Sequence, residues 1–208
     1  MILYFAPTIF RQAGFPSRQG SFLASGISGI INFVLTIPAQ IYVDKIGRRM
    51  PLLIGSLIIS TALLTLGSLY IARGQPLPDG SVGLTSGVPK YVAIISLYVV
   101  VATFASTWGP VGKIYAAEII PNQHRARACA IQTWVNWTTN FIVALTTPYF
   151  LSKAASGPYF LYGSLTLLAL LVLTKWMPET KGLGLERIGQ VFGIAVEERG
   201  CDEEGERN

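Results

Sequence analysis

Two long uncharged runs of the chain each carry a set of amide and hydroxyl side chains. In a helix that turns about 100° per residue, each set falls within an arc of roughly 120° on one face. Amides and hydroxyls both donate and accept hydrogen bonds, so two such faces suit a neutral, hydroxyl-rich ligand better than an ion. The sets lie in residues 22–42 and 128–150: Ser25, Ser28, Asn32, Thr36 and Gln40, then Gln132, Asn136, Thr139, Asn140 and Thr147.

Aromatic side chains accompany the second set. Trp134 and Trp137 flank Asn136, and an aromatic face can stack on the apolar face of a sugar ring. The other interpretation is that these polar groups only hydrogen-bond one helix to the next. The sequence by itself leaves both interpretations open.

The elements that carry these residues are predicted to be membrane-spanning helices. The chain has 208 residues, of which 51% are hydrophobic and only 13% are charged, whereas soluble domains carry about 25% charged residues. About twenty apolar residues span a bilayer as a helix. Five runs of that kind predict five complete spans and argue against buried helices of a soluble fold: residues 22–42, 52–72, 91–112, 128–150 and 158–174.

The first ten residues are apolar but too few to span a bilayer, and Pro7 lies among them. We expect them to be the outer end of a spanning helix whose beginning is missing. A true start at Met1, with an interfacial segment, is the alternative.

The charged loops predict the orientation of the chain. Four charges, Asp44, Lys45, Arg48 and Arg49, stand between the first two runs. The side of the bundle that holds this loop carries seven Lys and Arg residues against five on the other side, which places it in the cytoplasm. The loop at 73–89 is then outside, and residues 191–208 are predicted to be a disordered cytoplasmic tail.

A kink is predicted in the third run, in the segment "TWGPVGKIYAAE". Pro110 removes a backbone hydrogen bond, and Gly109 and Gly112 loosen the turn. The kink is either a gate or a static feature. Lys113 is the one charge deep in a span, and we expect it to snorkel to the cytoplasmic interface.

Several classes of function are excluded by the residues that are present. The one histidine, His124, has no Ser or Cys partner at a spacing typical of a catalytic site, so the chain is not predicted to be an enzyme. The two cysteines have neither disulfide nor zinc spacing, and no cofactor or metal is expected. The basic residues are scattered, which argues against nucleic-acid binding.

Six segments occur in an order that resembles the C-terminal half of a sugar porter of the major facilitator superfamily. They are "YFAPTIF", "DKIGRR", "WGPVGKIYAAEIIP", "HRARA", "NWTTNFIV" and "PETKG". The resemblance implies an all-α integral membrane fold, the C-terminal six-helix bundle of that superfamily with its first helix truncated. Residues 1–14 would end helix seven, residues 15–190 would hold helices eight to twelve, and substrate would bind near the midplane between the two halves.

The resemblance also assigns roles to particular residues. It implies that Asn32, Asn136 and Asn140 contact the sugar and that Trp137 lies beside the cavity. Tyr4 and Phe5 match an aromatic outer gate, and Gly109 and Pro110 are candidate gating residues because of the predicted kink. A cytoplasmic charge network that latches the outward-facing state is implied on one surface: Asp44, Arg48, Arg49, Glu118, Arg125 and Glu179.

Three positions depart from the family pattern. Lys45 replaces the first arginine of the loop motif, Lys113 replaces a tryptophan of the cavity floor, and Ala105 stands where some members carry an acidic residue. The expected function is transport of a sugar, most simply a monosaccharide, across the plasma membrane by alternating access, either with a proton or without one. A transporter-like sugar sensor and an inactive truncated fragment are the alternatives. The expected partners are the sugar, the bilayer and a missing N-terminal half.

Overall fold

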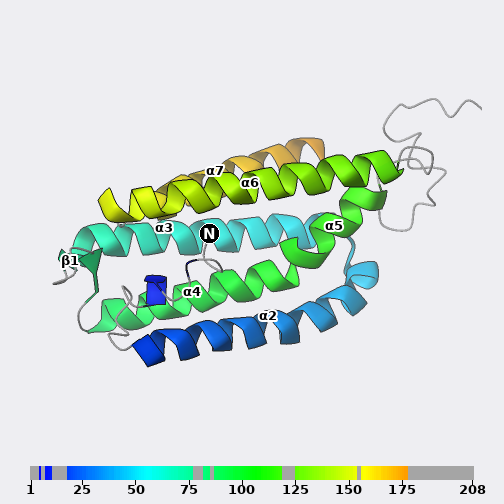
Figure 1. The fold of residues 1–208 in the computed structure, drawn as a ribbon. Helices are drawn as coiled ribbons and strands as arrows, with labels where there is room; N and C mark the ends of the chain where they lie inside the picture. The colour runs from blue at the N-terminus through cyan, green and yellow to red at the C-terminus, as the bar shows by residue number, and fades with distance from the viewer. Residues whose placement is uncertain are drawn as a thin grey trace, which may run out of the picture.

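The structure, a computed structural model, describes residues 5, 8–10, 18–76, 82–84, 87–118, 125–153 and 156–177. It is a bundle of roughly aligned helices (Figure 1). The helices are α2 (Arg18–Ile46), α3 (Arg49–Arg73), α4 (Val88–Ser106), α5 (Trp108–Glu118), α6 (Arg125–Lys153) and α7 (Gly157–Trp176). Two short antiparallel strands, β1 (Gln75–Pro76) and β2 (Val82–Gly83), lie in the predicted outer loop and are the one departure from a purely helical fold among these residues.

Four of the five predicted spans have the length and composition to cross a membrane. They are Ala24–Val43, Arg49–Arg73, Val88–Tyr115 and Gly157–Trp176. The fifth predicted span is helix α6, whose 29 residues are long enough at about 1.5 Å of rise per residue. It is absent from the spans found among the described residues because its amides and hydroxyls make it less apolar.

The kink predicted in the third run is confirmed as a break between α4 and α5. Helix α4 ends at Ser106, and Thr107 follows with φ −123° and ψ −79°. Proline has no N–H, and its ring clashes with the carbonyl four residues earlier, which here belongs to Ser106. The break therefore falls at the turn before Pro110. The amide of Val111 then restarts the helix by donating to Thr107 O over 3.0 Å.

Helix α3 is the packed centre of the bundle. It lies against α7 on one side and α4 on the other, and its buried face combines large apolar residues with small ones. The small residues allow close approach: a Cβ on Gly67 would lie 2.8 Å from Phe160 Cε2, and one on Gly55 would lie 2.8 Å from Thr107 Cβ. Ser60 Oγ, which is fully buried, donates to Gly163 O of α7 over 3.1 Å.

The ends of these helices next to β1 and β2 are joined by aromatic packing. The rings of Tyr70 on α3 and Tyr159 on α7 are stacked with centroids 5.3 Å apart, and both residues are buried. Leu84, beside β2, is buried in the same apolar cluster. The ring of Phe10 packs against that of Tyr98 on α4 at 5.2 Å.

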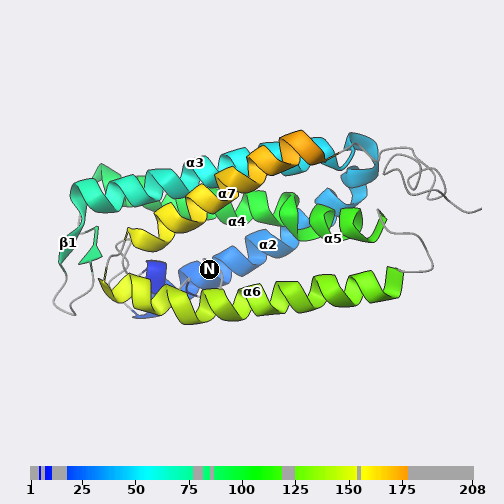
Figure 2. The ribbon, with the colours of Figure 1, turned by 90° about the horizontal axis from the view of Figure 1, so that it is seen from above.

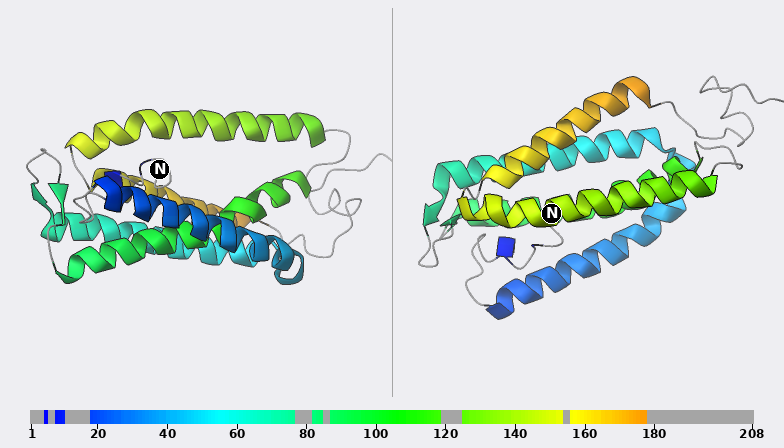
Figure 3. Two further views of the ribbon diagram at one scale, coloured as in Figure 1. Left: turned by 60° about the horizontal axis from the view of Figure 1, so that its bottom comes forward. Right: turned by 45° about the horizontal axis from the view of Figure 1, so that its top comes forward.

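Helix α6 is held much more loosely than α3. Among the described elements its main contacts are with α5 and α7, and both Figure 2 and the left view of Figure 3 show it apart from the other long helices. Between Arg125 and Phe150, where its side chains are described, Thr147 is the one buried residue. The helix that carries the second polar set therefore makes few contacts within the described chain.

Candidate functional site

The polar set on α6 is open and contains a paired amide. Asn140 Nδ2 donates to Asn136 Oδ1 over 2.9 Å, one helical turn apart. Asn136 is exposed and Asn140 half-buried, and the neighbouring Trp137 is 65% exposed. The pairing fixes the orientation of both amides and leaves a donor and an acceptor on each for another molecule.

The opposite face of α6 is mainly apolar. Trp134, Phe141 and Leu145 are all exposed, and at about 100° per residue they lie roughly opposite Asn136. A helix of this kind in a bilayer places its apolar face toward lipid and its amide face toward protein or water. The described chain covers only one end of the amide face, where Thr147 and Thr146 lie 3.2 and 3.4 Å from the hydroxyl of Tyr162.

The polar set on α2 is partly used within the bundle. Ser28 is buried and donates to Ala24 O of its own helix over 3.0 Å. Thr36 donates to Asn32 O over 2.7 Å and approaches Ala105 O of α4 at 3.4 Å. The helix-to-helix interpretation therefore holds for part of this set, whereas Asn32 is half-buried and Gln40 exposed.

The residues at the break between α4 and α5 pack against α3. Trp108 Nε1 donates to Ser56 Oγ over 3.0 Å, and Ser56 Oγ donates to Leu52 O over 2.7 Å. Thr107 lies against Gly55. Gly109 and Pro110, the predicted gating pair, follow directly, with Pro110 buried. Lys113, on α5, is exposed.

Only part of the predicted cytoplasmic charge network is described. Arg48, Arg49 and Arg125 are half-buried, and Arg49 Nη2 donates to Thr174 O of α7 over 2.9 Å. The side chains of Asp44 and Glu118 lie outside the described residues, as do Tyr4 and Glu179 entirely. Phe5 is described and packs against the main apolar cluster.

Three contacts of this region were not predicted from the sequence. They are the Trp108 bond to Ser56, the Tyr162 hydroxyl beside Thr147, and Tyr98, whose hydroxyl donates to Ala24 O of α2 over 3.2 Å. A buried tyrosine or tryptophan in a span needs a partner for its polar atom, and that rule was the available signal. Among the described residues, no group of three His, Cys, Asp or Glu side chains could hold a metal ion.

Residues 1–192 match the family described as "Sugar (and other) transporter". The chain belongs to this family. It is 33% identical over 195 residues to the D-xylose-proton symporter of Escherichia coli K12, covering 90% of this chain and 37% of the symporter. It is 32% identical over 197 residues to the high glucose sensor RGT2 of Saccharomyces cerevisiae, covering 92% of this chain and 24% of the sensor.

A solved structure shares the fold as well. The proton:xylose symporter XylE bound to 6-bromo-6-deoxy-D-glucose superposes with a TM-score of 0.74 at 32% identity, over 91% of this chain and 38% of that protein. The fold is thus the all-α fold of the major facilitator superfamily. Members of this sugar transporter family are transporters rather than enzymes. The chain spans well under half the length of these relatives.

Proposed function

We propose that this chain is the C-terminal half of a membrane carrier that moves a monosaccharide by alternating access. The proposal assigns sugar contacts to Asn32, Asn136 and Asn140, with Trp137 beside the passage. The single observation that carries it is the exposed amide pair on α6, where Asn140 Nδ2 donates to Asn136 Oδ1 over 2.9 Å. A fixed pair of amides with free donors and acceptors suits a ligand that is rich in hydroxyl groups.

The rest of the carrier is proposed to supply the other wall of the passage. The relatives are more than twice as long as the matched region, and the amide face of α6 needs a polar or aqueous neighbour inside a bilayer. In this proposal the break at Thr107 and the pair Gly109–Pro110 belong to a gating helix, with Tyr4 and Phe5 at the outer gate. The loop at 44–49 and the C-terminal tail lie in the cytoplasm, and the carrier resides in the plasma membrane.

The cytoplasmic latch is part of the same proposal. Asp44, Arg48, Arg49, Glu118, Arg125 and Glu179 would form a network in the outward-facing state and separate in the inward-facing state. Single exposed ion pairs contribute about 0–1 kcal/mol, but a network present in one state alone shifts the balance between two states. Arg48→Ala in the full-length carrier should raise the labelling of cytoplasmic-side cysteines, and unchanged labelling would contradict the latch.

The test of the transport proposal is uptake of radiolabelled D-xylose and D-glucose by cells that lack their own transport of these sugars. We expect uptake by the full-length carrier and a loss of about tenfold in Asn136→Ala, because one hydrogen bond to a bound sugar is worth about 1.4 kcal/mol. Thr138→Ala, on the opposite face of α6, is the matched control and should stay within about twofold. Equal uptake by Asn136→Ala and Thr138→Ala, at equal surface expression, would refute the assignment.

A sugar sensor is the second candidate, because the chain also resembles the high glucose sensor RGT2. A sensor binds sugar without moving it, so the uptake assay separates the two. Binding of sugar to the purified full-length protein without uptake would favour the sensor. Proton symport would appear as uptake that collapses when the proton gradient is dissipated.

The length of the native protein is tested by an immunoblot of native membranes. An antibody to residues 197–208 should detect a band at more than twice the 22.5 kDa of this chain, because the matched region is only 37% of the D-xylose-proton symporter. A band at 22.5 kDa alone would contradict the proposed half, and this chain would then be a half-size protein or an inactive fragment.

A further inference from the structure

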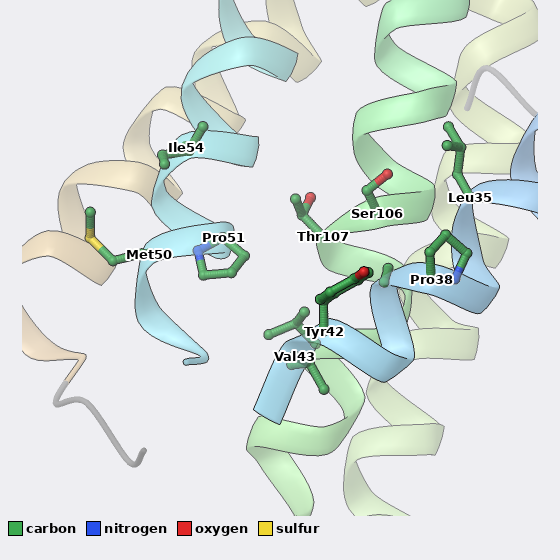
Figure 4. Close-up of a pocket in the computed structure, with 11 residues that line it drawn as sticks. Leu35, Pro38, Tyr42, Val43, Met50, Pro51, Ile54, Ser106 and Thr107 are labelled. Carbon is green, nitrogen blue, oxygen red and sulfur yellow. The ribbon is translucent and has the colours of Figure 1, made fainter. Parts of the chain in front are cut away.

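A hollow of about 410 Å³ lies where α2, the start of α3 and the α4–α5 break meet. Figure 4 shows its walls: Leu35, Pro38 and Tyr42 from α2, Met50, Pro51 and Ile54 from α3, and Ser106 and Thr107 beside the break. Its volume falls within the range of roughly 300–1,000 Å³ that is typical of small-ligand pockets. It is separate from the amide pair on α6, and the break at Thr107, which the transport proposal assigns to the gating helix, forms one of its walls.

The lining of the hollow is almost entirely apolar. The two hydroxyls at the break are already bonded within their own helix, since Ser106 Oγ donates to Ala102 O over 2.8 Å and Thr107 Oγ1 donates to Thr103 O over 2.7 Å. The other lining residues are apolar except for the phenol of Tyr42. A sugar would find few partners here, because buried hydroxyls need hydrogen bonds. An alkyl chain needs none.

The mouth of the hollow is apolar and open. Tyr42, Met50 and Ile54 are 52%, 53% and 52% exposed. Both helices that carry them are candidate membrane spans. Exposed apolar side chains on a membrane span contact lipid chains or other spans.

Positive charge stands at the rim. Lys45 Nζ lies 5.8 Å from the centre of the Tyr42 ring, and Tyr42 lines the hollow. Arg48 in the loop and Arg49 at the start of α3 lie at the same end of the bundle, although Arg49 Nη2 donates to Thr174 O of α7. Residues 44–49 carry three cations and one carboxylate, a net charge of +2. Basic residues at a membrane surface attract anionic lipid headgroups.

We propose that this hollow is a binding site for one acyl chain of an anionic phospholipid, whose headgroup is held by the basic rim. The apolar lining accounts for the chain and the rim for the headgroup, and both lie at the same end of the bundle. The bound chain would lie against Thr107, the residue at which α4 ends.

The test uses the full-length protein in lipid nanodiscs that contain phosphatidylglycerol with a photoreactive diazirine in one acyl chain. After illumination, mass spectrometry locates the cross-links. We expect labelled Tyr42, Met50 or Ile54 to exceed other lipid-exposed positions, such as Phe141 and Leu168, by at least about fivefold. Phosphatidylcholine with the same photoreactive chain should label these residues at least about threefold less.

Matched variants distinguish binding of an acyl chain in the hollow from lipid contact elsewhere on the protein. Ala39→Phe fills the hollow and should lower the cross-link yield at Met50 and Ile54 about fivefold. Ala72→Phe, the same change at the exposed far end of α3, should leave it unchanged. Uniform labelling of all exposed positions, or an unchanged yield in Ala39→Phe, would overturn the acyl-chain site. Equal labelling by the two lipids would overturn the role of the basic rim.

Discussion

Helices α3 and α6 are both long, yet their surroundings differ. Among its 25 residues, α3 buries nine, and three of those nine are Gly55, Ser60 and Gly67 at close contacts with neighbouring helices. Helix α6 has 29 residues and buries only Thr147 among its described side chains. In a membrane, small residues let helices approach closely, and that packing drives association. The composition of α3 therefore suits a helix at the packed centre of the bundle. That of α6 suits a helix whose amide face borders another part of the protein or water.

The contrast also separates two uses of polar side chains. On α3, Ser56 and Ser60 are buried and bonded across helices, to Trp108 and Gly163. On α6, Asn136 and Asn140 bond each other and remain open. Polar groups that hold helices together are thus distinct from polar groups that are available to a ligand. Four changes test this distinction.

The largest effect is expected at the closest contact of α3. A leucine at Gly55 would collide with Thr107, because even a Cβ would lie 2.8 Å from Thr107 Cβ. We expect Gly55→Leu to destabilise the full-length protein by about 3 kcal/mol, the upper part of the range for overpacking. Thermal unfolding in detergent measures it. Gly26→Leu is the control, since a Cβ there has no neighbour within 4 Å and the change carries the same gain in helix propensity. Equal unfolding temperatures for the two variants would contradict the packed role of α3.

The next effect concerns activity and compares two tryptophans on α6 with similar exposure, 65% for Trp137 and 69% for Trp134. Trp137 lies nearer to the amide face and Trp134 on the apolar face. Trp137→Leu should lower sugar uptake about tenfold, or about 1.4 kcal/mol, through lost stacking on the sugar. Trp134→Leu should leave uptake within about twofold, and the reverse order would show that the faces have been assigned wrongly.

A smaller effect is expected for the bond between α3 and α7. Ser60→Val removes the donor to Gly163 O and should cost about 1 kcal/mol in thermal unfolding, within the range measured for interhelical bonds in membranes. Ser68→Val is matched to it, because Ser68 is exposed and its hydroxyl donates to Thr65 O within the same helix. No difference between the two valine variants would mean that this bond does not hold α7.

The smallest effect is expected at the contact between α6 and α7. Tyr162→Phe removes the hydroxyl that lies 3.2 Å from Thr147 Oγ1, and we expect a loss of about 0.6 kcal/mol. Tyr91→Phe changes an exposed phenol and serves as the comparison. A loss as large as that of Gly55→Leu would show that α6 depends on this contact far more than its exposure indicates.

Much of the fold could be predicted because its determinants are local. Four of the five uncharged runs each correspond to one helix, as the run at 52–72 does to α3 (Arg49–Arg73), and the run at 91–112 corresponds to α4 and α5. The break at Thr107 follows from the missing N–H of Pro110. The packing of that break against α3 could not be predicted, because Trp108 donates a hydrogen bond to Ser56, which lies 52 residues earlier in the sequence. The pairing of β1 with β2 likewise depends on contacts across a loop that has no clear strand pattern.

The candidate site was predicted less completely than the fold. Asn136 and Asn140 share a face as the spacing predicts, and their mutual bond follows from that spacing. On α2, in contrast, Thr36 turns toward Ala105 of α4, because the packing of two helices decides which part of a polar arc is covered. That choice depends on tertiary contacts that the sequence of α2 alone does not contain.

Cysteine labelling on α6 tests the central claim, that the amide face borders a water-filled sugar passage. The full-length carrier, with Cys129 and Cys201 replaced by serine, would carry Asn140→Cys or, on the opposite face, Thr138→Cys. A membrane-impermeant thiol reagent should label Asn140→Cys and not Thr138→Cys, and D-xylose or D-glucose should slow that labelling. Labelling of Thr138→Cys but not of Asn140→Cys, or equal rates with and without sugar, would contradict the account.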